Sequence, residues 1–434
     1  MSVVIIANVV LVLVLILGVP IPLAFFAATL SIVIFGGYDH TFLLPYGYNK
    51  ISSIILVAIP LFILAGSLME KGGIGKSLVD FVEMFIGKIK GGLGVVMVVS
   101  CGLFGAISGS GMATLSCIGS IMLPRMYEAG YPKGISSAVI SSGALLSLLI
   151  PPSLNQILYA FVGSQSVLAS FMATLLPGII MIILLSLTNL WLLRNDTNIQ
   201  IAEPMPKKEF AVTLGKRTGK AIPALIAPLI ILGGIYGGFM TPTEAAAVSI
   251  IYAIPVGLLI YKELRGKAFK DSLVSAGTTA GVVMIMLFSV MVLSRLYVME
   301  NVPQMILNAM FSVSENRAVL ILMVNLFLIA VGMLMDDTSA ILLTTPIILP
   351  VVIALGIHPI HYAAIMGVNI GMGCAMPPVA PFLYLGARVG DASIDEMLKP
   401  TFWIIMFAWL PTLLLTTYVP SLSLFIPRAL GLII

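Results

Sequence analysis

The sequence predicts an all-α polytopic membrane protein built from two inverted repeats, each with a re-entrant helical hairpin and a broken helix. Three observations lead to this fold class: an apolar composition, an internal repeat, and glycine-rich breaks inside long apolar runs. Of the 434 residues, 60% are hydrophobic and 9% are charged, whereas soluble domains carry about 25% charged residues. With a mean hydropathy of +1.14, the chain is expected to cross a bilayer many times.

Membrane-spanning helices are expected wherever about 20 consecutive residues are mostly apolar. The N-terminal stretch has no basic start and no small-residue cleavage site, so we interpret it as the first span and not as a secretory signal. The candidate spans are approximately 3–17, 20–36, 51–69, 134–150, 168–193, 222–240, 243–261, 276–298, 318–335, 338–355, 360–376 and 401–420.

Two basic polar stretches orient the chain. They cover residues 194–220 and 261–270, and together they contain Arg194, Lys207, Lys208, Lys216, Arg217, Lys220, Lys262, Arg265, Lys267 and Lys270. Because positively charged loops stay in the cytoplasm, both stretches are expected there. The two spans between them return the chain to the same side, so the two assignments agree.

Two shorter segments predict helices of other kinds. Residues 71–92 repeat apolar side chains at helical spacing with charges between them, which indicates an amphipathic helix along the membrane interface. Residues 303–313 are a weaker counterpart. Thr241, Pro242 and Glu244 form a helix start of the capping-box kind at the beginning of the span 243–261.

An internal repeat appears when the chain is shifted by 226 residues. The shift aligns Pro124 with Pro350 and Gly130 with Gly356, and it places the double proline 151–152 on the double proline 377–378. Duplicated halves are typical of secondary transporters, whose binding site lies at the interface of the repeats.

The stretch "GAISGSGMATLSCIG" (105–119) predicts the first re-entrant hairpin. The apolar runs beside it, 93–107 and 112–123, are each too short to span a bilayer comfortably. Between them lie Ser108, Gly109, Ser110 and Gly111. Glycines allow backbone carbonyls to turn toward a ligand and serines supply hydroxyl oxygens, the neutral ligands that Na⁺ needs. A helix-packing face is the alternative, but packing needs small residues at every fourth position and not four in a row.

Three further clusters complete the predicted sites. Ser141, Ser142 and Gly143 precede a helix broken by prolines, and Ser153 and Asn155 follow that break. In the second half, "MDDTSA" (335–340) corresponds to the first tip, and "VNIGMGCAMPPVAPF" (368–382) contains the second break. Asp336 and Asp337 are carboxylates inside the membrane, which are costly unless they are paired or functional. Two tips with two broken helices suggest two cation sites that flank one substrate site.

Several classes of function are excluded or disfavoured. The chain has no Walker motif, so it does not hydrolyse ATP itself, and no nucleotide cofactor is expected. The net charge of +4 is explained by basic loops beside the spans, so no nucleic-acid partner is expected. The three cysteines have neither metal-ligand nor disulfide spacing.

The motifs together resemble the large membrane subunit of the tripartite ATP-independent periplasmic (TRAP) transporters. The resemblance covers nearly the whole chain and depends on five motifs in order: "FGAISGSGMATLSCIGSIMLP", "ISSGALLSLLIPPS", "GGIYGGFMTPTEAAAV", "GMLMDDTSAILLTTPIILP" and "GVNIGMGCAMPPVAPFLY". It implies a multi-pass protein of the bacterial inner membrane that imports organic acids, such as sialic acids or C4-dicarboxylates, by a Na⁺-driven elevator movement. It also implies two partners, a small four-helix membrane subunit and a periplasmic substrate-binding protein.

The resemblance places the family's motif residues on 108–111, 151–153, Asp336 and Thr338, and the clusters above supply the other expected site residues. The expected substrate-binding residues are Ser108, Ser110, Ser153, Asn155 and Asn369. Two or more Na⁺ sites are expected from Ser108, Gly109, Ser110, Ser141, Ser142, Gly143, Asp336, Thr338, Gly371, Gly373 and Met376. Asp337 is a second acid that we do not regard as part of the family's usual pattern. The expected scaffold comprises residues 1–92, 194–275 and 276–317, and an interfacial arm helix belongs to its first part. The two transport repeats are expected at 93–193 and 318–400. Residues 401–434 are expected to form a C-terminal helix.

Two other kinds of function remain open. A single-component or proton-coupled carboxylate transporter would use Asp336 and Asp337 as proton carriers. A membrane-embedded enzyme, such as an aspartyl protease, would need two facing acids on separate helices. Adjacent residues on a helix diverge by about 100°, which argues against that pair and against an enzyme.

Overall fold

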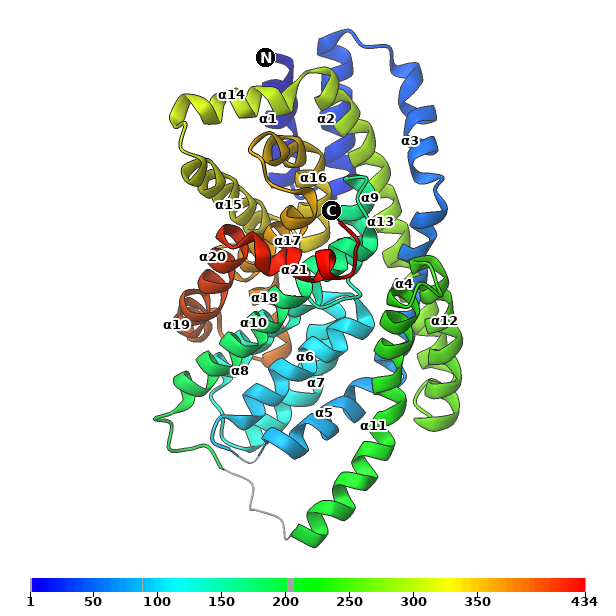
Figure 1. The fold of residues 1–434 in the computed structure, drawn as a ribbon, viewed down its shortest axis with the longest axis vertical. Coiled ribbons are helices and arrows are strands. Elements are labelled where there is room, and N and C mark those ends of the chain that lie inside the picture. Colours follow the sequence, from blue (N-terminus) through cyan, green and yellow to red (C-terminus); the bar gives the residue numbers. More distant parts are fainter. Residues whose placement is uncertain (1, 88, 201–206, 434) are drawn as a thin grey trace.

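The computed structural model describes residues 2–87, 89–200 and 207–433, and all of its regular elements in these ranges are helical (Figure 1). Eight of the described helices are long and apolar enough to cross a membrane. The first half contains α1 (Ser2–Ile16), α2 (Ile21–Gly36), η1 (His40–Phe42), α3 (Leu43–Ile51), η2 (Ile54–Val57), α4 (Ala58–Lys71), α5 (Ile74–Ile86), α6 (Gly92–Ser108), α7 (Gly111–Glu128), α8 (Lys133–Ala144), η3 (Leu145–Leu148), α9 (Leu154–Val162) and α10 (Val167–Leu193).

Residues 201–206, which belong to the predicted loop 194–220, lie outside the described residues, and the second half of the chain follows them. It contains α11 (Lys207–Tyr236), α12 (Pro242–Pro255), η4 (Val256–Ile260), α13 (Lys267–Met299), α14 (Val302–Val313), α15 (Arg317–Leu334), α16 (Asp337–Ala354), α17 (Pro359–Ala375), α18 (Pro381–Gly390), α19 (Ile394–Ile404), η5 (Ile405–Trp409), α20 (Leu410–Tyr418) and α21 (Pro420–Ala429).

The predicted repeat is present in the fold. Helices α7 and α16 each have 18 residues and begin 226 residues apart, at Gly111 and Asp337. Helices α8 and α17 begin at Lys133 and Pro359, again 226 residues apart. Both repeats then break at their double prolines, where each peptide bond between the two prolines is cis. The two halves therefore share one order of hairpin, helix and broken helix.

The two hairpins enter from opposite faces. The base of α6 and α7 lies beside the end of α10, because Lys90 Nζ donates to the Arg194 carbonyl at 3.0 Å. The base of α15 and α16 follows α14, at the far end of the 33-residue helix α13. Figure 1 shows these bases at opposite ends of the molecule. With the basic stretches in the cytoplasm, the second base is periplasmic.

The helices pack in two groups. Helix α4 packs against α12 and α13, and α13 also packs against α2. In the second group, α8 packs against α18 and α19, and α10 packs against α17 and α21. The repeats are joined within this group, since Tyr127 Oη donates to the Gly390 carbonyl at 2.6 Å and Lys133 Nζ to Asp391 Oδ2 at 2.8 Å. The latter contact lowers the pKa of Asp391.

Helix boundaries differ from the expected spans at several places. The span 222–240 belongs to a helix that begins at Lys207, because the preceding lysines and arginines favour helix and continue it beyond the bilayer. The span 276–298 begins at Lys267, so the expected boundary between 275 and 276 falls inside α13. The C-terminal helix expected at 401–434 is four elements, of which α19 starts earlier, at Ile394. The predicted interfacial helices correspond to α5 and α14, and the capping box of Thr241 and Glu244 is formed.

Candidate functional site

The two hairpin tips share a capping side chain at the start of the second arm, but the residue before it is left-handed in the first tip (Gly109) and extended in the second (Met335). In the first, Gly109 takes a left-handed φ of 63°, and Ser110 caps α7 by accepting the Ala113 N–H at 3.5 Å. In the second, Asp336 caps α16 by accepting the Ser339 N–H at 3.1 Å, and it also accepts the Ser339 hydroxyl. Because 110 plus 226 is 336, the repeat places a hydroxyl and a carboxylate in equivalent capping positions. The arms α6 and α15 are about 25 Å long, so both tips reach deep into the molecule.

Helix α9 connects the two tips. The Leu154 N–H donates to the Gly109 carbonyl at 3.2 Å, which attaches α9 to the first tip. At the second tip, Asn155 Nδ2 donates to Asp337 Oδ2 at 2.7 Å, and Thr338 Oγ1 donates to Asn155 Oδ1 at 3.2 Å. Asp337 is only 5% exposed. The amide of Asn155 therefore joins the broken helix of the first repeat to the hairpin of the second.

A cavity of about 500 Å³ lies between the tips and the first group of helices. Its lining contains both carboxylates and five hydroxyl side chains, but no lysine, arginine or histidine. The residues that line it are Pro20, Ile21, Pro22, Gly109, Ser110, Met112, Leu154, Asn155, Thr278, Thr279, Val282, Val283, Met286, Asp336, Asp337, Thr338 and Ser339. Among the described lining residues, the two carboxylates therefore have no cationic side chain beside them.

The same cavity is also suited to an anionic group. Helices α7, α9 and α16 all begin at its wall, after Ser110, Ser153 and Asp336. The start of a helix carries unpaired N–H groups and a partial positive charge, which favour anions. At α16 the Thr338 and Ser339 N–H groups already bond to Asp337 and Asp336, so the starts of α7 and α9 are the ones suited to an anion.

A crevice of about 290 Å³ lies beside this cavity and shares Ser110, Met112, Leu154 and Thr279 with it. Its remaining polar wall comes from Ser67 and Glu70 of α4, Ser108 and Ser116 of the first hairpin, and Ser275 of α13. The crevice therefore runs between the two helix groups, and Glu70 is the acid on its lining.

The predicted first-half residues fall at different depths from the cavity. Gly109, Ser110 and Asn155 line it, whereas Ser108 lies in the crevice and is hydrogen-bonded to Thr114 Oγ1 at 3.2 Å. The side-chain oxygen of Ser153 is buried without a hydrogen-bond partner among the described residues. This orphaned oxygen at the first break is compatible with the predicted role of Ser153 as a substrate ligand, which remains a prediction.

The cluster 141–143 lies on a helix-packing face. The Ser141 hydroxyl donates to the Ser137 carbonyl at 2.7 Å, and a Cβ on Gly386 of α18 would collide with it. Gly143 faces Cys101 of α6. Ser142 Oγ is buried and has no hydrogen-bond partner among the described residues, so it is the oxygen of this cluster that is free to bind a ligand.

The second-half residues divide in the same way. Asp336 and Thr338 line the cavity, whereas Asn369 is buried in α17 and donates to Asn325 Oδ1 at 3.0 Å. Asn369 Oδ1 has no partner among the described residues. Gly371 packs against Trp409, and Gly373 packs against the Ile329 carbonyl of α15. Met376 caps the end of α17. The assignment of Gly371, Gly373 and Met376 to Na⁺, and of Asn369 to the substrate, remains a prediction.

The wall opposite the tips is not among the predicted site residues. That wall is built by Pro20–Pro22, Thr278, Thr279 and Glu70. The pair Thr278–Thr279 between small residues in an apolar run was a signal that could have identified α13 as part of the site. In the predicted spans, Pro20 is only the first residue of the second span, 20–36.

Comparison with known proteins identifies relatives along nearly the whole chain. The family described as "Tripartite ATP-independent periplasmic transporter, DctM component" matches residues 8–422. The chain is 33% identical over 401 residues to the C4-dicarboxylate TRAP transporter large permease protein DctM of Rhodobacter capsulatus, with 89% of each chain covered. It is 30% identical over 378 residues to the sialic acid TRAP transporter large permease protein SiaM of Vibrio cholerae, with 87% of each chain covered.

Two further comparisons concern length and fold. The isethionate TRAP transporter permease protein DctMQ of Oleidesulfovibrio alaskensis is 33% identical over 420 residues, which are 95% of this chain but only 64% of that relative's length. The crystal structure of the Alcanivorax borkumensis YdaH transporter aligns with a TM-score of 0.58 at 15% identity and covers 89% of this chain and 88% of its own. That structure supports the fold alone.

Proposed function

The chain belongs to the DctM family of tripartite ATP-independent periplasmic transporters, so we propose that it imports an organic anion together with Na⁺. Members of this family are multi-pass permeases of the inner membrane and not enzymes. The observation that carries this proposal is the cavity between the tips, where Asp336 and Asp337 lie without a cationic side chain on the lining. A bound cation would neutralise these carboxylates and allow an anion to enter the same space.

The residues present fit a sodium ion. Na⁺ is a hard cation that takes hydroxyl, carbonyl and carboxylate oxygens. Such oxygens come from Ser110, Asp336 and Thr338 at the tips, and Ser153 Oγ is an unpartnered oxygen nearby. Bound Na⁺ would supply the positive charge that holds the substrate anion, and the N-termini of α7 and α9 would orient that anion.

The substrate belongs to the organic acids. The named relatives carry C4-dicarboxylates, sialic acid and isethionate, which differ in size but share an anionic group. The N-termini of α7 and α9 would bind such a group without selecting the rest of the molecule. We therefore propose that a periplasmic binding protein selects and delivers the substrate, and that a small membrane subunit completes the permease.

An elevator movement suits the packing. The cavity and the crevice separate the group of α2, α4, α12 and α13 from the group that holds the hairpins and broken helices. We propose that the first group is the static scaffold and that the second moves the bound substrate across the membrane as one body.

The decisive experiment is uptake of labelled C4-dicarboxylate or sialic acid into proteoliposomes that contain the permease and both partner proteins. An inward Na⁺ gradient should drive uptake, and replacement of Na⁺ by K⁺ should abolish it. The second candidate is proton coupling, which the burial of Asp337 beside Asp336 would favour. Equal uptake in K⁺ buffer with an inward pH gradient would establish that candidate instead.

A further inference from the structure

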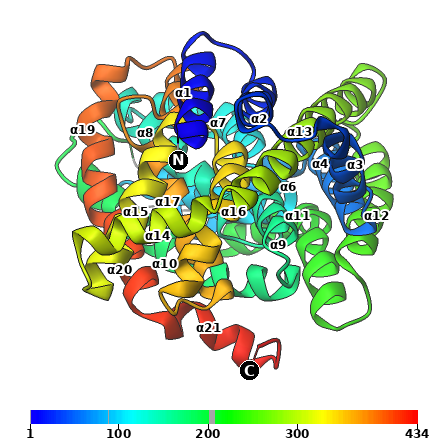
Figure 2. The same cartoon turned by 90° about the horizontal axis from the view of Figure 1, so that it is seen from above.

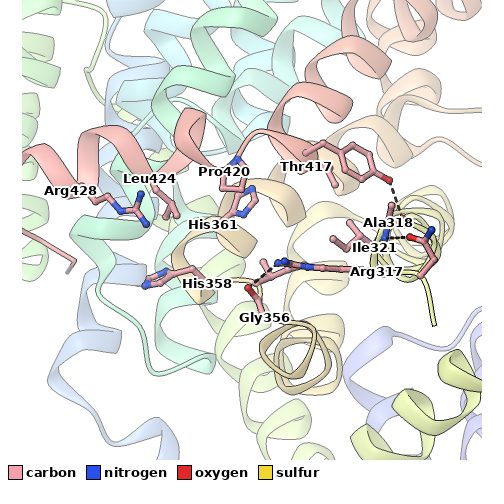
Figure 3. Close-up of a pocket in the computed structure, with 13 residues that line it drawn as sticks. Arg317, Ala318, Ile321, Gly356, His358, His361, Thr417, Pro420, Leu424 and Arg428 are labelled. Carbon is pink, nitrogen blue, oxygen red and sulfur yellow. Dashed lines mark hydrogen bonds between the residues drawn. The ribbon is translucent and has the colours of Figure 1, made fainter. Parts of the chain in front are cut away.

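A second cavity, of about 600 Å³, lies far from the tips, at the base of the second hairpin (Figure 3). It is formed by the start of α15, the loop from α16 to α17, and the segment that joins α20 to α21. Arg317 and Asp336 are separated by the length of α15, about 27 Å, so this cavity is distinct from the transport site. Because the base of the second hairpin is on the face opposite the basic loops, the cavity opens at the periplasmic face.

The lining of this cavity is strongly electropositive. It contains Arg317, Arg428, His358 and His361, and no aspartate or glutamate is among its described lining residues. Helices α15, α17 and α21 all begin at its wall, so their N-terminal N–H groups add positive potential. Figure 3 shows Arg317 and Arg428 on opposite sides of the two histidines.

The two arginines supply the positive charge of the lining, since His358 accepts the Ile360 N–H at Nδ1, burial lowers the pKa of His358, and burial also disfavours the charged form of His361. Arg317 Nη2 donates to the Gly356 carbonyl at 3.1 Å, which leaves its other N–H groups available. His361 is 3% exposed and is fixed by a 2.7 Å bond from Nε2 to the Thr416 carbonyl. Arg428 is exposed, and its guanidinium makes no hydrogen bond or ion pair within the described part of the chain. A guanidinium at each end of one cavity matches an anion with several oxygens, such as a phosphate.

The surroundings of the cavity are those of a lipid-facing surface. Helices α15 and α20 lie at the outer edge of the molecule in Figures 1 and 2. Apolar side chains near the cavity on these helices are exposed, Val319 at 38%, Leu322 at 44% and Leu415 at 43%. Tyr418 marks the polar boundary, and its hydroxyl donates to the Ala318 carbonyl at 3.2 Å. A ligand with a phosphate head and apolar tails suits both parts of this region.

We propose that the cavity of Arg317, His358, His361 and Arg428 binds the phosphate of an anionic phospholipid from the periplasmic leaflet. The phosphate lies between the two guanidinium groups, and the acyl chains follow the apolar faces of α15 and α20. Basic recesses between membrane helices bind lipid phosphates by this combination of charge and hydrogen bonds. The bound lipid connects the base of the second hairpin to the C-terminal helices.

Native mass spectrometry of the purified permease, extracted from bilayers of phosphatidylglycerol and phosphatidylcholine, tests this site. The wild-type protein should retain phosphatidylglycerol in preference to phosphatidylcholine. Arg428→Gln should weaken that retention about tenfold, because a charge-assisted contact is lost, and Arg317→Gln with Arg428→Gln should abolish the preference. Arg428 makes no contact that the fold needs, so the single variant tests the site even if the double variant does not fold.

The matched control is Arg388→Gln, which removes an exposed arginine at the end of α18, outside the cavity. It should retain phosphatidylglycerol as the wild type does. Equal retention by Arg428→Gln and the wild type would overturn the site. A second arm adds inorganic phosphate in millimolar excess. Displacement of the lipid by phosphate alone would show a soluble phosphate site and overturn the lipid assignment, whereas persistence of the lipid would support it.

Discussion

At the scale of single residues, the two adjacent acids of the second tip have different surroundings. Asp336 is partly exposed to the cavity and caps α16, whereas Asp337 is buried and accepts a hydrogen bond from Asn155. This difference suggests a division of roles that the sequence left open. Asp336 is the carboxylate that faces the cavity, and we propose it as the cation ligand, whereas Asp337 bonds to Asn155 of the other repeat.

Asp336→Asn should reduce uptake strongly and raise the Na⁺ concentration needed for half-maximal rate at least tenfold, because the variant keeps the size and the cap but loses the charge. Ser110→Ala should cause a milder shift, since backbone carbonyls remain at that tip. The measurement is the Na⁺ dependence of uptake in proteoliposomes. An unchanged Na⁺ curve for Asp336→Asn would remove this carboxylate from the cation site.

Asn155→Ala should destabilise the protein by about 2 kcal/mol, because it leaves the buried Asp337 carboxylate without its donor. Asp337→Asn should cost less, since its amide oxygen can still accept the hydrogen bond. The free energies of unfolding of Asn155→Ala, of Asp337→Ala and of the variant with both changes form a double-mutant cycle with the wild type. The free energy of unfolding of Asp337→Asn is measured beside them. Additive effects in that cycle would contradict a direct link between the repeats.

At the scale of elements, the first hairpin and α4 meet without space for a side chain. A Cβ on Gly66 would lie 2.7 Å from the Ser108 carbonyl oxygen, so α4 passes directly against the first tip. This contact is between the two helix groups. A glycine at such an interface lets the backbones of neighbouring membrane helices approach closely.

Gly66→Ala should slow uptake several-fold, because the added methyl group pushes the tip away from α4. Gly277→Ala is the matched control: this glycine lies inside α13 and has no atom within 4 Å of the position of a Cβ. The control should transport normally and gain helix propensity of about 1 kcal/mol. Equal rates for both variants would show that the close contact at Gly66 has no part in movement.

At the scale of the whole molecule, the cavity and the crevice divide the helices into the proposed scaffold and the proposed moving body. Ser67 and Ser116 line the crevice from opposite groups. Ser67 and Ser272, in contrast, lie within one group, where the Ser67 hydroxyl donates to the Ser272 carbonyl at 3.2 Å. These two pairs share Ser67 and so allow a matched comparison.

In a background without Cys101, Cys117 and Cys374, Ser67→Cys with Ser116→Cys should stop uptake when a bifunctional reagent links the two thiols. The pair Ser67→Cys with Ser272→Cys should keep most of its activity after the same treatment, because its link lies within the scaffold. Uptake before and after reduction of a cleavable reagent measures the effect. Strong inhibition of the second pair would contradict the division into two bodies.

The sequence by itself determined the features that depend on local pattern. Apolar runs marked the spans, the motif around Ser108–Gly111 marked the first tip, and the 226-residue offset placed Asp336 at the second tip. These features are readable because helix caps, breaks and hydropathy are set by residues within one or two turns of each other. The 226-residue offset then predicted the second tip from the first, including the equivalent capping residues Ser110 and Asp336.

Only the tertiary structure decided which of these residues meet. The pairing of Asn155 with Asp337 joins residues 182 positions apart, and the wall of Pro20, Thr278 and Glu70 comes from distant helices. Ser141 and Gly371 had the same small-residue pattern as the tips but pack against Gly386 and Trp409. Small and polar residues serve both packing and binding inside a membrane, so their role depends on the neighbouring helix, which a local pattern does not specify.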